Sequence, residues 1–124
     1  MPSFGTRSTS NLITCDQKLQ DVLNEAIKHF DFSIIWGHRG MEEQNRIFDK
    51  GYSKLRWPMS RHNTRPSRAF DVVPYPDGYR ASDETFYFLA TCILRAAMEL
   101  GIHLTWGGHW KNFKDLAHFQ LKDN

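Results

Sequence analysis

Two amphipathic helical patterns, separated by short runs of apolar residues, constrain the fold of this sequence more than any other feature. The first follows Thr14 and Gln17, whose spacing is typical of a capping box, and predicts a helix over residues 16–30. The second begins after Ser82, a predicted N-cap, and ends at Gly101. Its apolar stripe consists of Phe86, Leu89, Ala90, Ile93, Ala97 and Leu100. Each predicted helix therefore has one face to bury against a second apolar layer.

Short apolar segments supply that second layer. The β-branched run over residues 32–36 predicts a buried strand, and further strands are predicted over residues 69–74, 102–105 and 118–121. A short helix is predicted over residues 42–49, ended by Gly51. Together these patterns predict an α+β domain in which two core helices flank a small antiparallel sheet, with one additional short helix.

Two segments lack a periodic pattern. Residues 1–12 are polar and are expected to form a loose lead-in. Residues 52–67 contain two prolines and predict a long loop, and loops of this length in compact domains are usually functional or disordered. Because no repeat or linker interrupts the pattern, we expect one domain over residues 1–124, without a second, separate binding domain.

Composition excludes several classes of protein. The 124 residues include 16 Lys and Arg against 14 Asp and Glu, a formal charge of +2 that is too small for the basic face of a nucleic-acid-binding protein. No segment reaches the roughly 18 consecutive apolar residues of a membrane span. Cys15 and Cys92 are too few for a disulfide framework or a four-thiolate zinc site. The first residues lack the apolar core of a secretory signal, so we expect folding in a reducing cytoplasm.

Asp71 is the most unusual residue of the predicted strands. It lies among apolar neighbours in Ala-Phe-Asp-Val-Val-Pro, where a carboxylate is costly unless it is paired or binds a cation. On residue type alone, an ion pair with Arg61, Arg65 or Arg68 is the favoured explanation. His62, in the long loop, is by the same reasoning an exposed loop histidine.

The end of the sequence adds a second candidate pair. Asp115 lies three residues before His118, so a helical turn would project both side chains to one side. Two histidines and one carboxylate are a recurrent ligand set for catalytic zinc, with the fourth position left for water. His62, Asp71 and His118 can supply such a set, and Asp115 can supply the general base beside the water.

The remaining candidates favour structural explanations. Ser60 and His62 are too close in sequence for a Ser-His-Asp triad, and Cys92 lies on the apolar side of a predicted helix. A structural role is also the expectation for the other four histidines, His29, His38, His103 and His109. Among these, His109 lies between glycine and tryptophan and could line a cleft.

These motifs resemble a known family. Ser60-Arg-His62, Ala69-Phe-Asp71-Val-Val-Pro, Trp106-Gly-Gly-His-Trp110 and Asp115-Leu-Ala-His118-Phe-Gln are similar to motifs of the LAS-type zinc peptidoglycan peptidases (peptidase family M15). Within that group, the sequence most resembles the phage L-alanyl-D-glutamate endopeptidases, which are endolysins related to D-Ala-D-Ala carboxypeptidases. The segment Gly37-His-Arg39-Gly-Met-Glu-Glu-Gln44 matches the family's Gly-Tyr-Arg…Gln segment. The resemblance implies the zinc peptidase fold of DD-carboxypeptidases and hedgehog-like domains.

The resemblance also assigns roles to individual residues. The family's zinc ligands fall on His62, Asp71 and His118, and its catalytic carboxylate falls on Asp115. The arginine that binds the substrate carbonyl as charge develops falls on Arg39. Positions that bind substrate or support the site fall on Gln44 and Ser60. Trp106 and Trp110 are expected either to form the walls of the cleft or to support the Asp115 turn as core aromatics.

The spacing between two of these ligands differs from that of many relatives. They place the first histidine and the aspartate seven residues apart, whereas His62 and Asp71 are nine apart. The intervening residues must therefore bulge outward if both side chains are to reach one metal ion.

The implied function is hydrolysis of the L-Ala–D-Glu bond in peptidoglycan stem peptides by one Zn²⁺ ion, causing host cell lysis. A phage enzyme of this kind is expected to be a monomer in the host cytoplasm and to reach the periplasmic peptidoglycan after a holin opens the membrane. We expect no nucleic-acid partner and no stable membrane association. Two alternatives remain open: a D-Ala-D-Ala carboxypeptidase on the same scaffold, and a zinc-containing wall-binding module without catalysis. Asp115 and Arg39 argue against the second, because a binding module needs no general base.

Overall fold

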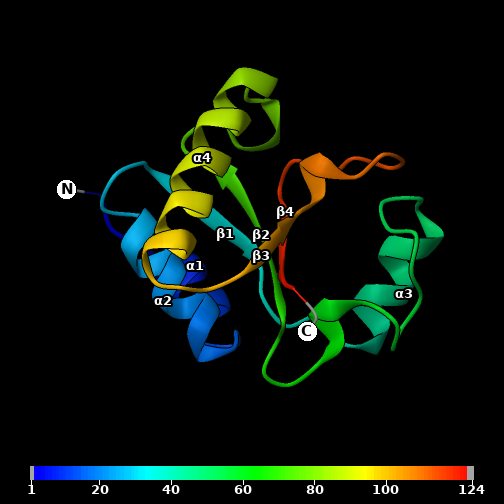
Figure 1. The fold of residues 1–124 in the computed structure, drawn as a ribbon. Coiled ribbons are helices and arrows are strands. Elements are labelled where there is room, and N and C mark those ends of the chain that lie inside the picture. Colours follow the sequence, from blue (N-terminus) through cyan, green and yellow to red (C-terminus); the bar gives the residue numbers. More distant parts are fainter. Residues whose placement is uncertain (1, 123–124) are drawn as a thin grey trace.

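A computed structural model describes residues 2–122 of the chain. Four antiparallel strands form one sheet in the order β1-β2-β4-β3: β1 (Phe32–Trp36), β2 (Ala69–Pro74), β4 (His118–Leu121) and β3 (Leu104–Trp106). Helices α1 (Thr6–Leu12), α2 (Gln17–Ala26) and α4 (Asp83–Glu99) lie on one side of the sheet, and α3 (Met41–Asp49) lies on the other (Figure 1). Short 3-10 turns complete the chain: η1 (Arg61–Asn63), η2 (Gly78–Arg80) and η3 (Gly107–His109). The predicted α+β architecture with an antiparallel sheet is confirmed.

The apolar core lies between the sheet and helices α2 and α4. From the sheet it receives Phe70, Val72, Phe119 and Leu121, which alternate along β2 and β4 with residues that point to the opposite face. From α4 it receives Leu89, Ala90, Ile93, Ala96 and Ala97, as the helical spacing predicts. Burial of these side chains holds the two layers together and leaves the other face of the sheet free for a site.

The sequence prediction was wrong about the first residues. Residues 6–12 form α1, which packs on β1 and is no loose lead-in. Ser8 is buried there, and its hydroxyl accepts a hydrogen bond from the Ile34 N–H at 3.0 Å. The helix was missed because its residues are mostly polar and it buries only Ser8 and Leu12, so no apolar period marks it.

Several element boundaries also differ from the predictions. Helix α2 ends at Ala26 and is capped by Asp16, which accepts from the Lys18 N–H, whereas the Thr14 hydroxyl donates to the Asn11 carbonyl. Leu100 lies beyond α4 and is 45% exposed, so it does not belong to the buried stripe. The third strand begins at Leu104, two residues later than predicted, and includes Trp106. The Ser82 cap is confirmed, since its hydroxyl accepts from the Thr85 N–H.

Candidate metal and catalytic site

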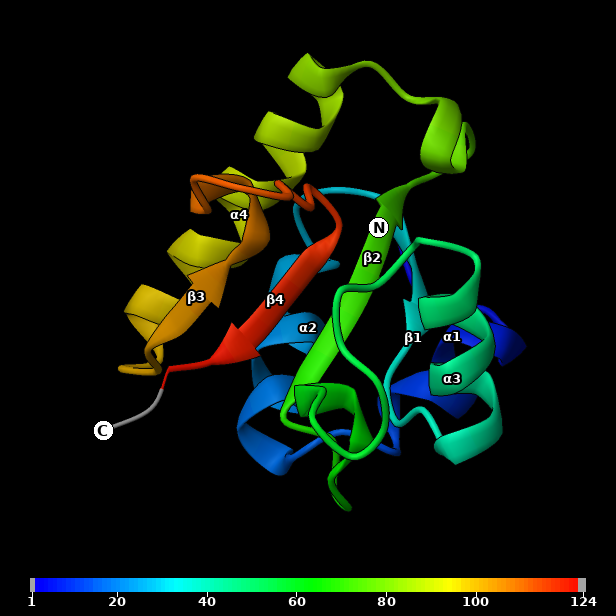
Figure 2. The same cartoon turned by 90° about the vertical axis from the view of Figure 1, so that its right-hand side faces the viewer.

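Three side chains that could ligate a metal converge on the sheet face opposite the core. Asp71 and His118 are paired residues on neighbouring strands β2 and β4, so their side chains project side by side. His62 comes from η1, in the loop that crosses in front of this face (Figure 2). His62 Nε2 lies 3.3 Å from Asp71 Oδ1 and 3.2 Å from His118 Nδ1, and the last two atoms are 3.0 Å apart. The structure therefore brings the three predicted ligands together in one buried cluster.

The hydrogen bonds behind the two rings fix which nitrogen atoms face the cluster. His62 Nδ1 lies 2.8 Å from the Gly37 carbonyl oxygen, and His118 Nε2 lies 2.8 Å from Gln120 Oε1. Both oxygens only accept hydrogen bonds, so each ring donates its N–H outward and presents a lone pair inward. A metal-binding histidine is held in the same way, with its other N–H on a carbonyl or carboxylate.

This donor set fits a zinc ion. Two imidazole lone pairs and a carboxylate oxygen repel one another unless a cation separates them. Ligand atoms at about 2.0–2.1 Å from a tetrahedral zinc ion lie about 3.3 Å apart. The observed separations of 3.0, 3.2 and 3.3 Å match that spacing without rearrangement.

Arg39 sets the orientation of the Asp71 carboxylate. Its Nη2 donates to Asp71 Oδ2 at 3.0 Å and its Nη1 donates to Gln44 Oε1 at 3.0 Å, while the guanidinium lies 4.7 Å from the Trp36 ring centroid. Because Oδ2 is occupied by the arginine, Oδ1 remains directed at the histidines. The expected ion pair of Asp71 with Arg61, Arg65 or Arg68 is wrong, since the buried partner is Arg39.

Gln44 supports Arg39 and does not line either cavity described below. Its side chain has no exposed surface, and its Nε2 donates to the Leu55 carbonyl at 2.6 Å and to Ser53 Oγ at 3.1 Å. These contacts fit the second of the two roles expected for Gln44, that of supporting the site.

The loop that carries His62 closes on itself outside the site. The Arg68 N–H donates to the Arg61 carbonyl at 3.1 Å, so the extra residues between His62 and Asp71 bulge away from the sheet. Ser60 caps η1 by accepting from the His62 N–H, and the Asn63 side chain donates to the carbonyl of Arg39. The nine-residue spacing therefore does not prevent the two ligands from meeting. The expectation of an exposed His62 is wrong, because only 2% of this residue is exposed.

Asp115 lies beside the ligand cluster on a tightly held turn. Its N–H donates to the Gly107 carbonyl at 3.1 Å, and its Oδ1 accepts from the Ala117 N–H at 3.2 Å. A Cβ atom at Gly107 would collide with the carbonyl oxygen of Asp115, which explains a glycine at this position. The residues from Asp115 to His118 form a turn, not a helix, yet both side chains line the same cavity.

Trp106 supports this turn from the core. It is 8% exposed, and its indole N–H donates to the Leu116 carbonyl at 2.9 Å. Trp106 lines neither cavity described below, and its place in the core fits the expected alternative of a supporting core aromatic. Trp110, in contrast, lines the cavity and packs against the His118 ring at a centroid distance of 5.2 Å.

Burial and neighbouring charges shift the pKa values of the site. Burial raises the pKa of the Asp115 carboxyl, and the charge of Asp71 raises it further. Burial also acts to raise the pKa of Asp71, but His62 and His118 outweigh it and hold the value well below the usual range. Burial lowers the pKa of His62, whereas for His118 the adjacent Asp71 carboxylate, which favours the protonated imidazole, overcomes burial and raises the pKa. The lowered pKa of Asp71 favours the ionised form that a metal ligand needs. The raised pKa of Asp115 makes its carboxylate a better proton acceptor than an ordinary aspartate.

Two cavities meet at this site. The larger has a volume of about 640 Å³ and extends from Arg39, Asp71 and Asp115 toward α3. The smaller has a volume of about 110 Å³ and includes His62, His118, Ser60 and Trp110. Arg39, Asp71 and Asp115 line both, so the candidate catalytic groups lie where the cavities join.

The sequence reasoning missed three residues of the site. Asn63 and Gln120 hold Arg39 and His118 through the hydrogen bonds described above, and Tyr79 lines the larger cavity. Gln120 could have been found, because it lies two residues after His118 on a strand and therefore shares its face. Nothing in the local pattern marks Tyr79, which lies on a separate turn.

Comparison with known proteins agrees with this geometry. The family model described as phage L-alanyl-D-glutamate peptidase matches residues 2–122. The chain belongs to this family. A solved structure, that of the Serratia marcescens L-Ala D-Glu endopeptidase ChiX, has 35% sequence identity to it, with a TM-score of 0.81. That match covers 96% of this chain and 89% of the other. No curated protein matches the sequence.

Membership confirms the resemblance stated from the sequence motifs and identifies the chain as a peptidase with the endopeptidase fold. Of the alternatives, neither the carboxypeptidase nor the binding module gains support from these matches. None of the helices in residues 2–122 is long and apolar enough to cross a membrane.

Proposed function

We propose that this protein is a zinc-dependent endolysin that hydrolyses the L-Ala–D-Glu bond of peptidoglycan stem peptides. As its family indicates, it is an L-alanyl-D-glutamate endopeptidase acting on peptidoglycan. The observation that carries the zinc-dependent mechanism is the convergence of two imidazole lone pairs and one carboxylate oxygen beside Asp115, at the junction of two cavities.

His62, Asp71 and His118 would hold the zinc ion. Bound there, zinc would supply a Lewis acid that makes water a nucleophile near neutral pH and polarises the peptide carbonyl. Gly37 and Gln120 keep the two imidazole rings in the ligating tautomer, and Arg39 keeps the Asp71 carboxylate in place.

Asp115 is the proposed general base and general acid. Its carboxylate takes a proton from the attacking water and then delivers this proton to the leaving nitrogen of D-Glu. Its raised pKa suits both steps, because a carboxyl group that is too acidic would return the proton poorly.

Arg39 is the proposed electrostatic partner of the developing oxyanion. It is 5% exposed and lines both cavities, and its Nε is buried without a hydrogen-bond partner among the described residues. A fixed cation in such a site stabilises negative charge on the carbonyl oxygen by roughly 3–4 kcal/mol, as single donors do in other hydrolases.

The biological setting completes the proposal. The enzyme acts as a monomer and a single peptidase domain, remains in the host cytoplasm until a holin opens the membrane, and then reaches the periplasmic peptidoglycan. The phage family supports an endolysin role in host cell lysis.

Substitution of Asp115 by Asn tests the assignment of the base. The Asp115→Asn variant should retain one zinc ion per chain and the thermal unfolding of the wild type, since the amide keeps the size of the side chain. Its kcat on a stem peptide should fall by about 10²–10⁴-fold, the range for loss of a general acid–base group. Asp77→Asn, an exposed aspartate on the η2 side of the molecule, is the matched control. Wild-type kcat in Asp115→Asn would show that another group is the base.

A further inference from the structure

The larger cavity extends well beyond the groups that the proposed mechanism uses. From Asp71, Arg39 and Asp115 it continues between α3 and the loop that precedes β4. Its volume of about 640 Å³ is several times the 110 Å³ of the cavity that contains both histidine ligands. The extension therefore has room for a part of the substrate larger than one small side chain.

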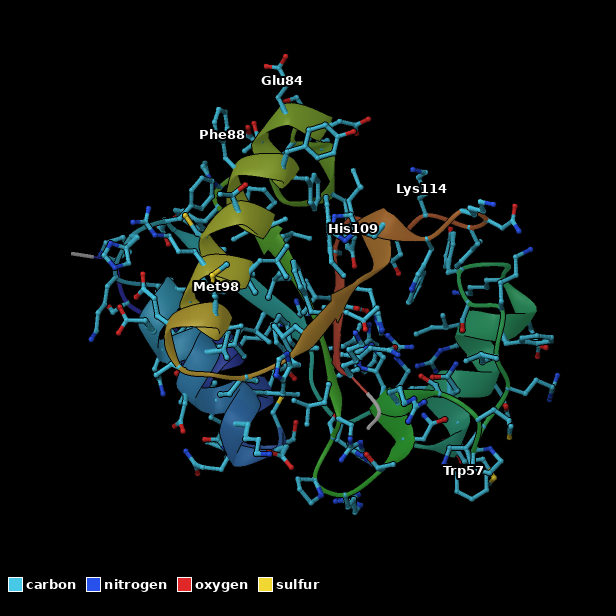
Figure 3. The ribbon with its side chains drawn as sticks, viewed as in Figure 1. Trp57, Glu84, Phe88, Met98, His109 and Lys114 are labelled. Carbon is cyan, nitrogen blue, oxygen red and sulfur yellow. The ribbon has the colours of Figure 1, made fainter. Side chains whose placement is uncertain are left out.

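Two walls of this extension carry cations. Arg46 on α3 and Lys50, the C-cap residue of that helix, lie four residues apart, so both face the cavity from the same side of α3. Lys114, whose place on the loop before β4 is marked in Figure 3, also belongs to the residues that line the cavity. Among the described residues, no carboxylate forms an ion pair with any of these three side chains.

The acidic residues of the cavity do not neutralise these cations. Within the described part of the chain, Asp71 and Asp115 are the carboxylates that line the cavity, and both belong to the catalytic centre. Asp71 is already paired with Arg39. The extension is therefore a positively charged recess, and an anion bound there would relieve the repulsion among its cations.

The smaller cavity differs in both size and charge pattern. Arg61 and Lys54 line it in addition to Arg39, and the Lys54 ammonium lies 5.1 Å from the centroid of the Phe113 ring. By its volume the smaller cavity suits a small group, whereas the extension has room for a longer, anionic one.

The two residues joined by the scissile bond differ in the same way as the two cavities, since one is small and the other is larger and anionic. L-Ala contributes only a methyl side chain, whereas D-Glu in a stem peptide is joined onward through its γ-carboxyl group and keeps a free α-carboxylate. We propose that Arg46, Lys50 and Lys114 bind this α-carboxylate and so place the D-Glu half of the substrate in the larger cavity. The inference rests on the proposed function and adds the residues that select an acidic leaving group.

A pair of synthetic peptides tests the proposal on the zinc-loaded protein. One is L-Ala-γ-D-Glu-meso-diaminopimelate with a free D-Glu α-carboxylate, and the other carries an α-carboxamide at the same position. The wild type should cleave the acid with about tenfold higher kcat/KM than the amide, as expected for a few partly exposed ion pairs. The difference should lie in KM and should shrink as salt is added.

The triple variant Arg46→Gln, Lys50→Gln, Lys114→Gln should lose this preference, so that the acid-to-amide ratio of kcat/KM falls to about one. The triple variant Arg7→Gln, Lys18→Gln, Lys111→Gln removes the same charge from exposed positions outside the cavity and should keep the wild-type ratio.

Equal cleavage of acid and amide by the wild type would overturn the inference while leaving the proposed function intact. A wild-type acid-to-amide ratio in the variant that lacks Arg46, Lys50 and Lys114 would also overturn the inference. Failure of the wild type to cleave either peptide would instead overturn the proposed function, and the inference with it.

Discussion

Neighbouring residues on β2 and β4 point to opposite faces of the sheet and meet opposite surroundings. Phe70 and Phe119 stack at a centroid distance of 5.3 Å in the apolar core. Asp71 and His118, each one residue along, face the polar cluster with His62 and Arg39. Both faces are buried, but burial of apolar surface stabilises the first, whereas hydrogen bonds and charge pairs stabilise the second.

The difference lies in how strictly each face fixes its partners. Burial of apolar surface is non-directional, so the core needs side chains of suitable size and little else. The polar face needs a specific partner for every N–H, lone pair and charge, because an unpaired buried group costs roughly 1–3 kcal/mol. Those partners come from outside the sheet: Gly37 from the segment after β1, Asn63 from η1 and Gln44 from α3. Changes on the core face should therefore reduce stability, and changes on the polar face should reduce metal binding and activity.

The largest effect is expected for His62→Ala. Removal of this imidazole should abolish stoichiometric zinc binding and lower kcat/KM by roughly a thousandfold or more, because several kcal/mol of transition-state stabilisation depend on the metal. Zinc content and peptide hydrolysis measure the two effects. His29→Ala removes an exposed histidine that pairs with Glu25 and should behave as the wild type. Full zinc occupancy and activity in His62→Ala would contradict the assigned ligand set.

On the core face, Ile93→Ala should lower the free energy of unfolding by about 2–5 kcal/mol, because Ile93 on α4 is fully buried and leaves a cavity. Ile93→Val, which removes one methyl group, should cost about 0.5–1.5 kcal/mol. Urea unfolding gives both values. The activity per folded molecule should change little in either variant, and a large loss of kcat without loss of stability would break the separation of the two faces.

A smaller effect, on zinc affinity, is expected for Gln120, which holds the ligand His118 by a hydrogen bond. Gln120→Ala removes the acceptor of the His118 Nε2–H and should weaken zinc affinity by about 10–100-fold, the range for partners of ligating histidines. Competition with a chromophoric chelator measures the affinity. Gln17→Ala, which breaks an exposed hydrogen bond to Asp21 on α2, is the control. Unchanged zinc affinity in Gln120→Ala would show that the strand alone orients His118.

The smallest effect is expected at the start of α4. Ser82→Ala removes the hydroxyl that caps the Thr85 N–H and should lower the free energy of unfolding by about 1 kcal/mol. Zinc affinity and kcat/KM should remain at wild-type values, because this cap serves only the core helix. A loss of zinc affinity would mean that the two faces are coupled through α4.

The same contrast explains how much of the molecule could be predicted from its sequence. The α4 stripe, both central strands and the antiparallel α+β layout follow from apolar periodicity, which records burial on the core face. The ligands His62, Asp71 and His118 were assigned because their residue types and motifs are specific. The sequence analysis did not predict helix α1 or the Asp16 cap, because both consist mainly of polar residues and show no apolar periodicity.

The partners of the site could not be predicted from local pattern. Asp71 was expected to pair with an arginine nearby in sequence, yet its partner is Arg39, which is 32 residues away. Trp106 was expected either in the cleft or in the core. Its position at the end of β3 places its side chain in the core cluster, which the sequence alone could not show. Both outcomes depend on how loops cross the sheet, which follows from the three-dimensional packing of the chain.

Mass spectrometry of digested peptidoglycan tests the central claim most directly. Purified peptidoglycan of the Gram-negative type would be treated with zinc-loaded protein, with metal-stripped protein and with stripped protein to which zinc is restored. The account predicts peptides with a new N-terminal D-Glu, and L-Ala left on the glycan, in the first and third samples only. Loss of terminal D-Ala alone, or equal release by the metal-stripped protein, would contradict it.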